Sequence, residues 1–435
     1  MSFVPDVSIP KGAARRVAYF AAAVALLGLP SFAAAQWYNH GDETFSVKTT
    51  VQTPNNSTLN GFDISYVDPS VGEYFLADST DKAILAINTS TKTPTFLDQG
   101  GFSGAPATCG VPHACNGPDG VLTVHTANAV QIWAGNYPSN VKVLDYPSGT
   151  VLTTINIPKP NSTTPGSYRT DEGCWDPEDH LVVFANDADT PPFISFISTD
   201  NDHVVKQISF DGKPGDGPNA TNGIEQCQWN QREHAFYLNL PEVNGSGADT
   251  ADGNVVVINP HTFKIEQTFD IPVAKCAGPQ GMAIGPAPQI LLGCNAKGPP
   301  NNTGPQNAAI MDEENGHLIN VLDNQGGNDE VWYNPGDGHY SLAEGSHATT
   351  DYLGIVDSQP ISLDQQIPIA PVPAAGSGPH SVAEDPISNE IYMPIEAAVA
   401  SPICPTAGVG CVAIFKSNRP EQHYVYRDHD HDHDH

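Results

Sequence analysis

Seven polar residues recur along the chain at nearly equal intervals, from 49 residues (Gln280 to Asp329) to 56 residues (Asp63 to Asp119). We call them the anchors: Asp63, Asp119, Asp171, Glu225, Gln280, Asp329 and His380. Five carboxylates, one amide and one imidazole that met in space could not all carry their charges without a compensating cation. Oxygen ligands suit Ca²⁺ or Mg²⁺, and an added imidazole admits Mn²⁺ or Zn²⁺. The pattern predicts a divalent metal site formed by Asp63, Asp119, Asp171, Glu225, Asp329 and His380.

Two other interpretations of the anchors stay open. In the first, the anchor side chains cap turns and bind water without any ligand. In the second, the site is catalytic, with His380 as the general base because imidazole titrates near neutral pH. Glu225 would then be its partner or a metal ligand.

A second group of metal-binding side chains lies at the C-terminal end. Asp and His alternate from Asp428 to His435, and the histidines are His429, His431, His433 and His435. In an extended chain, alternate residues point to opposite sides, so the imidazoles share one side. We expect residues 417–435 to be a disordered tail that captures Zn²⁺, Cu²⁺ or Ni²⁺. A purification tag or a solubilising end would leave the same pattern.

The anchors mark repeats filled with short strands. After the anchor Asp63, strands are predicted over residues 63–68, 73–77, 83–87 and 93–97, each bounded by Gly, Pro, Asp or Asn. A turn pair such as Asp68-Pro69 or Asp385-Pro386 follows most anchors by five and six residues. A period of about 50 residues with four strands per repeat indicates a β-propeller blade.

Seven anchors predict an all-β, seven-bladed β-propeller of four-stranded blades over residues 36–416. The last repeat lacks a fourth strand, and the strand-like segment Thr44–Val51 precedes the first repeat. We expect this N-terminal strand to close the ring, because that removes the last open sheet edge. An eight-bladed ring would require a further repeat, which we do not find.

Residues 1–35 have the features of a signal peptide. Lys11, Arg15 and Arg16 precede the apolar run Val17–Leu29, and Ala33-Ala34-Ala35 forms a small-residue cleavage site. We therefore expect an exported protein, periplasmic or secreted, although a retained membrane anchor is an alternative. Stable membrane insertion is not expected, because no later segment reaches roughly 20 apolar residues. The formal net charge of −31 opposes nucleic acid as a partner.

An exported protein can form disulfides, and the chain has eight cysteines. Local spacing favours Cys109–Cys115 and Cys404–Cys411, and a predicted antiparallel strand pair would bring Cys276 to Cys294. Cys174 then remains with Cys227, in similar places of neighbouring repeats. The alternative, a thiolate metal site, is disfavoured because no C-x-x-C occurs.

The blade pattern resembles that of the NHL/YVTN-type propellers, which include the streptogramin lyases and the SMP-30/gluconolactonase-like lactonases. The resemblance rests on an anchor after Gly-Pro, then Asp-Pro, then a strand such as Glu390-Ile391-Tyr392-Met393. It extends over nearly all of the chain after residue 36, but no catalytic motif of these enzymes matches residue by residue. It implies that the anchors surround the mouth of a central channel, on the face where ligand and metal bind.

Three functions are compatible with this sequence. The first is an exported propeller that binds a divalent metal, and with it a small ligand, at the channel mouth. The second is a metal-dependent lactonase or lyase that uses the same residues. The third is a scaffold that binds protein partners on the propeller face.

Overall fold

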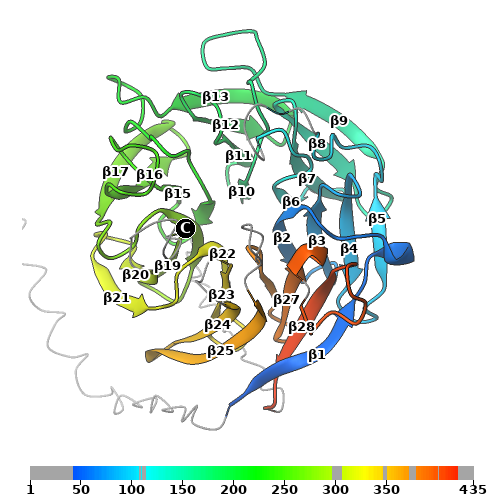
Figure 1. The fold of residues 1–435 in the computed structure, drawn as a ribbon. Coiled ribbons are helices and arrows are strands. Elements are labelled where there is room, and N and C mark those ends of the chain that lie inside the picture. Colours follow the sequence, from blue (N-terminus) through cyan, green and yellow to red (C-terminus); the bar gives the residue numbers. More distant parts are fainter. Residues whose placement is uncertain are drawn as a thin grey trace, which may run out of the picture. The chain divides into compact units, whose positions relative to one another are not determined.

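Seven antiparallel sheets of four strands each make up the fold. The computed structural model describes residues 43–106, 109, 114–295, 306–345, 350–371, 379–399 and 401–419. The sheets are arranged as blades around a central axis (Figure 1). The predicted all-β, seven-bladed propeller is therefore confirmed. Within the described ranges, no helix is long and apolar enough to cross a membrane.

Each blade has an inner, a second, a third and an outer strand. The inner strands are β2 (Phe62–Asp68), β6 (Val121–His125), β10 (Gly173–Asp176), β14 (Cys227–Asn230), β18 (Pro279–Ile284), β22 (Asn328–Asn334) and β26 (Ala383–Asp385). The second strands are β3 (Glu73–Asp78), β7 (Val130–Asn136), β11 (Leu181–Asn186), β15 (Ala235–Leu240), β19 (Gln289–Cys294), β23 (His339–Glu344) and β27 (Glu390–Ile395).

The third strands are β4 (Ala83–Asn88), β8 (Asn140–Asp145), β12 (Phe193–Ser198), β16 (Gly253–Asn259), β20 (Asn307–Asp312), β24 (Thr350–Ser358) and β28 (Cys411–Ser417). The outer strands are β5 (Pro94–Leu97), β9 (Val151–Asn156), β13 (His203–Ser209), β17 (Lys264–Ile271), β21 (Leu318–Asp323), β25 (Ile361–Pro371) and β1 (Phe45–Val51). Two 3-10 turns, η1 (Pro54–Asn56) and η2 (Ala397–Val399), complete the assigned elements.

The N-terminal strand closes the ring, as predicted. β1 pairs antiparallel with β28, from Phe45 opposite Ser417 to Val51 opposite Val412. The seventh blade therefore combines β26, β27 and β28 with a strand from the other end of the described chain.

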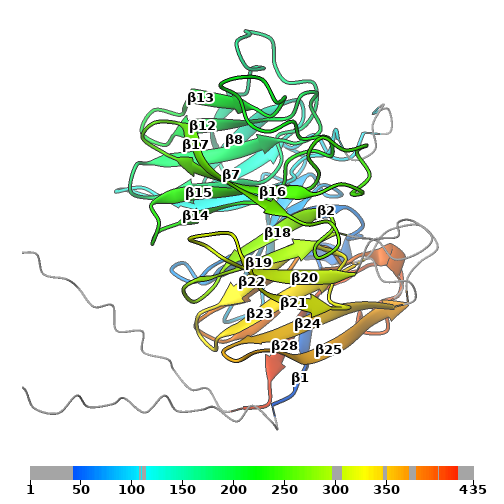
Figure 2. The same cartoon turned by 90° about the vertical axis from the view of Figure 1, so that its left-hand side faces the viewer.

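The strand sequences reflect burial between neighbouring blades. All six residues of β11 are buried, whereas β13, at the rim of the same blade, has only one buried residue. A second strand is covered on both faces by adjacent blades, so it is continuously apolar; a rim strand is partly solvated and alternates. The stacked blades are seen edge-on in Figure 2. Between blades three and four, the rings of Phe196 and Phe236 pack edge to face at 5.8 Å.

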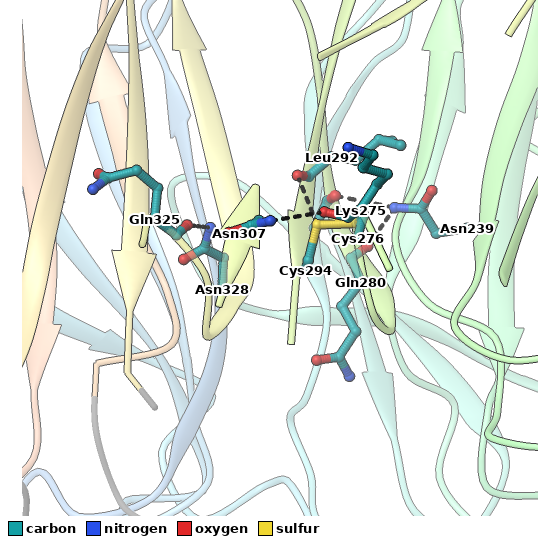
Figure 3. The surroundings of a disulfide bond; sticks show 10 residues. Asn239, Lys275, Cys276, Gln280, Leu292, Cys294, Asn307, Gln325 and Asn328 are labelled. Carbon is teal, nitrogen blue, oxygen red and sulfur yellow. Dashed lines mark hydrogen bonds between the residues drawn. A yellow bond between two sulfur atoms is a disulfide. The ribbon is translucent and has the colours of Figure 1, made fainter. Parts of the chain in front are cut away.

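All four predicted disulfides are present: Cys109–Cys115, Cys174–Cys227, Cys276–Cys294 and Cys404–Cys411. Cys174 and Cys227 join the inner strands β10 and β14 of neighbouring blades. Figure 3 shows the surroundings of Cys276–Cys294, where side-chain amides reach backbone carbonyls. There, Asn239 donates from Nδ2 to the carbonyl oxygens of Gln280 (2.7 Å) and Gly281 (3.0 Å), which links β15 to β18.

Close approach of the inner strands explains one glycine beside an anchor. A Cβ at Gly120 would lie 2.3 Å from the carbonyl oxygen of Asp171 and 2.8 Å from Cα of Glu172. Because both atoms belong to the backbone of the next blade, neither can move aside alone. We expect Gly120→Ala to lower the free energy of unfolding by about 1–3 kcal/mol through overpacking. Chemical denaturation with unchanged midpoint and slope would contradict this expectation.

Candidate functional site

The seven anchors lie at or just before the N-terminal ends of the seven inner strands, close enough to interact. Asp63, Asp119 and Asp171 each offer a carboxylate oxygen, and these atoms lie within 4.8 Å of one another. Gln280 donates from Nε2 to Oε1 of Glu225 at 2.9 Å. The charge of Asp329 acts on Asp63, Glu225 and His380. The structure thus brings these side chains together at one end of the channel, which we call the mouth, while their role as metal ligands stays a prediction.

Arg169, which we did not predict as a site residue, lies among the carboxylates. Its Nη2 is 2.7 Å from Oδ2 of Asp171, 3.5 Å from Oδ2 of Asp187 and 3.9 Å from Oδ2 of Asp63. Its Nε contacts Oδ2 of Asp119. The planar guanidinium presents several donors in a fixed geometry, so one side chain can serve carboxylates from three blades. The side chain is only 12% exposed.

Local contacts hold Arg169 in place. Its backbone N–H donates to the carbonyl oxygen of Ala114 at 2.8 Å, and its own carbonyl accepts from Nδ2 of Asn186 at 2.8 Å. A sequence signal for its role existed: Arg169 is the only Lys or Arg within two positions of any anchor. In a chain with 18 Lys and Arg against 49 Asp and Glu, such a neighbour is informative.

Among the described residues, the mouth contains more carboxyl groups than cationic groups. Besides five acidic anchors, Glu172 and Asp187 interact electrostatically with the same group. Burial raises the pKa of Asp63 to about 7, and Asp171 adds to this rise against the lowering effect of Arg169. Burial likewise raises the pKa of Asp187 to about 8. Seven carboxyl groups thus share Arg169 and His380, so some of them must hold protons or attract a further cation.

His380 carries a positive charge at neutral pH. Burial alone would lower its pKa. The charges of Asp63, Asp329 and Glu396 outweigh this effect and raise the pKa to about 9. Its ring stacks on that of Phe62 at 4.8 Å, and its Nε2 lies 3.0 Å from the carbonyl oxygen of Phe62. A protonated imidazole has no lone pair to accept a proton. This pKa therefore argues against the general-base role that we considered for His380.

Polar residues also lie at the C-terminal ends of the second strands, and several of them hold backbone segments in place. Asn186 and Asn239 hydrogen-bond to the backbone of Arg169 and of Gln280. Asp78 accepts from the backbone N–H of Thr80 at 3.0 Å and so caps a turn. Within this set, Asp187 contributes a carboxylate to the Arg169 cluster.

A second group with metal-ligand spacing lies away from the mouth, between blade six and the closing strand. It contains Glu43, His339 and Asp364. His339 faces Asp337 at 3.3 Å through Nδ1, and Asp357 at 3.3 Å through Nε2. Burial alone would lower the pKa of His339. Asp337 and Asp364 outweigh this effect and raise the pKa to about 11. The imidazolium is thus itself the cation of this cluster, which we interpret as a structural ion-pair group.

Some predicted residues fall outside the described part of the chain. They are the tail histidines His429, His431, His433 and His435, and the signal segment 1–35. The tail metal site and the signal peptide therefore stay predictions.

The comparisons with known proteins add only the fold. No family model matches the chain, and no curated protein matches its sequence. The chain is similar to a chain in a structure titled "Crystal Structure of Mitotic Checkpoint Complex", with a TM-score of 0.55 and 10% identity. The match covers 85% of this chain and 93% of that chain. What the two share is the propeller fold. The finer NHL/YVTN-type resemblance stays a prediction.

Proposed function

We propose that this chain is an exported binding protein that takes a divalent cation, Ca²⁺ or Mg²⁺, at the channel mouth. The observation that carries the proposal is the Asp63, Asp119 and Asp171 oxygen group, whose members lie within 4.8 Å of one another. These are the hard oxygen ligands that both cations prefer. The four disulfides support export, because such bonds persist in oxidising compartments.

The charges and unused oxygens of the mouth also support a cation there. Oδ1 of Asp171, Oδ1 of Asp187 and Oε2 of Glu172 are buried and make no hydrogen bond within the described structure. Arg169 faces Oδ2 of Asp171 and Oδ2 of Asp187, which leaves the other oxygen of each carboxylate for a metal. Metal and guanidinium would share these carboxylates, so the two cations compete electrostatically.

Calcium titration tests the site at the mouth. We expect Ca²⁺ to bind the chain lacking residues 428–435, measured by isothermal titration calorimetry after chelator treatment. Asp171→Asn should weaken the affinity by about tenfold or more, because it removes a charge from the metal's ligand set.

Asp323→Asn is the matched control, because it removes the same charge from an exposed position on the outer strand β21. Equal weakening by both variants would mean that net charge alone attracts Ca²⁺. Failure of both Ca²⁺ and Mg²⁺ to bind the parent protein would refute the proposal.

The tail is proposed as a separate, softer site for Zn²⁺, Cu²⁺ or Ni²⁺ at His429, His431, His433 and His435. Imidazole suits these metals and is a poor ligand for Ca²⁺. The full-length protein should therefore bind Zn²⁺ more tightly than the chain lacking residues 428–435, while both bind Ca²⁺ alike. Equal Zn²⁺ binding by the two proteins would mean that the tail does not contribute to metal binding.

The other two hypotheses have less support. The lactonase or lyase mechanism needs a base, and the raised pKa of His380 does not favour it in that role. The scaffold hypothesis is consistent with the propeller fold, but no described surface singles out a protein partner.

A further inference from the structure

A cavity of about 470 Å³ lies between the inner strands. Its lining comes from all seven inner strands or the residues beside them, so it is the central channel. None of the seven anchors lines it. The lining includes Pro69, Pro177, Pro335 and Pro386, which follow the ends of their inner strands. The volume falls within the range of roughly 300–1,000 Å³ that is typical of small-molecule sites.

Five aromatic side chains belong to this lining. Tyr66, Trp175, Trp229, Trp332 and Tyr333 come from β2, β10, β14 and β22, on different sides of the axis. Three of the chain's five tryptophans therefore line one cavity. The indole Nε1 atoms of Trp175 and Trp229 are buried without a hydrogen-bond partner in the described structure. Rings in such a place offer their faces or edges to an occupant of the channel.

The ionisable lining groups other than tyrosine are acidic. They are Glu330 and Glu384, and the described part of the lining contains no Lys, Arg or His. Glu330 is fully buried. Its Oε2 accepts hydrogen bonds from the backbone N–H groups of Ser65 (3.3 Å) and Val382 (3.1 Å) and is contacted by Ser381. Its Oε1 is buried and makes no hydrogen bond with any residue that the structure describes. The carboxyl group of Glu330, in blade six, is thus held by contacts from blades one and seven, and its second oxygen is buried without a described partner in the channel wall.

We propose that this cavity binds an organic cation, an ammonium group that carries apolar substituents, between the tryptophan rings and Glu330. Aromatic faces attract cations through the ring quadrupole. An anion would meet acidic groups with no compensating base, and a neutral ring would leave the Glu330 oxygen unpaired. A small metal ion would lose its hydration shell to rings that cannot replace it. This site uses none of the seven anchors, but it is electrostatically coupled to the mouth. Burial, with a smaller effect from Asp63, raises the pKa of Glu330 to about 8, and a bound organic cation would favour its ionised form.

Tryptophan fluorescence can report this binding directly. The chelator-treated protein would be titrated with choline and benzyltrimethylammonium, and with 3,3-dimethylbutan-1-ol, the uncharged carbon isostere of choline. We expect both ammonium probes to change the emission saturably at millimolar or lower concentration. The isostere should bind roughly tenfold more weakly or not at all, because the cation–π and carboxylate attractions are lost. Equal binding of the isostere, or no saturable change with either ammonium probe, would overturn the proposal.

Variants then locate the site, with calorimetry as the readout because they alter the fluorophores. Glu330→Gln and Trp229→Leu should each weaken benzyltrimethylammonium by roughly tenfold, whereas Trp229→Phe keeps a ring and most of the affinity. Glu314→Gln, an exposed carboxyl on a turn, is the control for loss of charge. If Trp229→Leu does not fold by circular dichroism, Trp175→Leu replaces it. Unchanged affinity in folded Glu330→Gln and in the tryptophan-to-leucine variant would place the probe elsewhere and refute the assignment.

Discussion

Replacing Arg169 with methionine is expected to lower the free energy of unfolding by about 3–5 kcal/mol, the range for removing one partner of a buried ion pair. The reason is that Arg169 contacts carboxylates from three blades, among them Asp63, Asp119 and Asp171. Methionine keeps the unbranched, flexible stem of the side chain but leaves these groups without their shared cation. Thermal unfolding and denaturant titration, followed by circular dichroism, measure the loss.

The same variant connects stability to the proposed metal site. If Ca²⁺ can supply the missing positive charge, it should raise the unfolding temperature of Arg169→Met more than that of the parent protein. Lys142→Met is a control, because Lys142 pairs with a single carboxylate, Asp98, at 3.0 Å. It should lose clearly less stability and show no Ca²⁺ rescue. Normal stability of Arg169→Met would contradict the ion-pair account; a destabilised variant without rescue would count against the metal proposal alone.

Removing the Cys174–Cys227 disulfide is the second change with a large expected effect. The bond closes a segment with a sequence separation of 53 residues. In the chain-entropy account, a crosslink of this span stabilises the folded protein by about 4 kcal/mol. The double variant Cys174→Ala/Cys227→Ala should therefore unfold at a markedly lower temperature, measured by calorimetry.

The Cys109–Cys115 bond provides the comparison, because its separation is only 6 residues. The same account gives about 2 kcal/mol for so short a loop, so Cys109→Ala/Cys115→Ala should be affected less. Equal losses in the two double variants would mean that loop entropy does not decide the contribution of these bonds.

The blades could be predicted because one physical period dominates the sequence. Each blade buries its second and third strands between neighbours, so apolar runs and turn residues repeat with the anchors. The closing role of Thr44–Val51 followed from counting strands, and the pairing of Phe45 with Ser417 confirms it. Strand lengths were harder to predict: β25, the outer strand of blade six, has 11 residues, whereas β5, the outer strand of blade one, has four.

The chemistry of the mouth could be predicted only in part. The anchors indicated which side chains face one another, but the partners of Arg169 lie up to 106 residues away, at Asp63. Such contacts depend on where the ring closes and how far a long side chain reaches. The pKa of His380 depends on charges from other blades in the same way. The channel tryptophans left a weak signal, because Trp175 and Trp229 directly precede the residues that end β10 and β14.

The pairing of β1 with β28 has a consequence for the order of folding. Residues 45–51 are made first among the described strands, and their partner, residues 411–417, is made last. During synthesis, β1 must therefore remain unpaired while the intervening six blades form, and long-range pairing of this kind is slow. A chain interrupted before residue 411 would expose unpaired strand edges, which are sites of aggregation. Only a chain that includes residues 411–417 can therefore form the pairing that closes the ring.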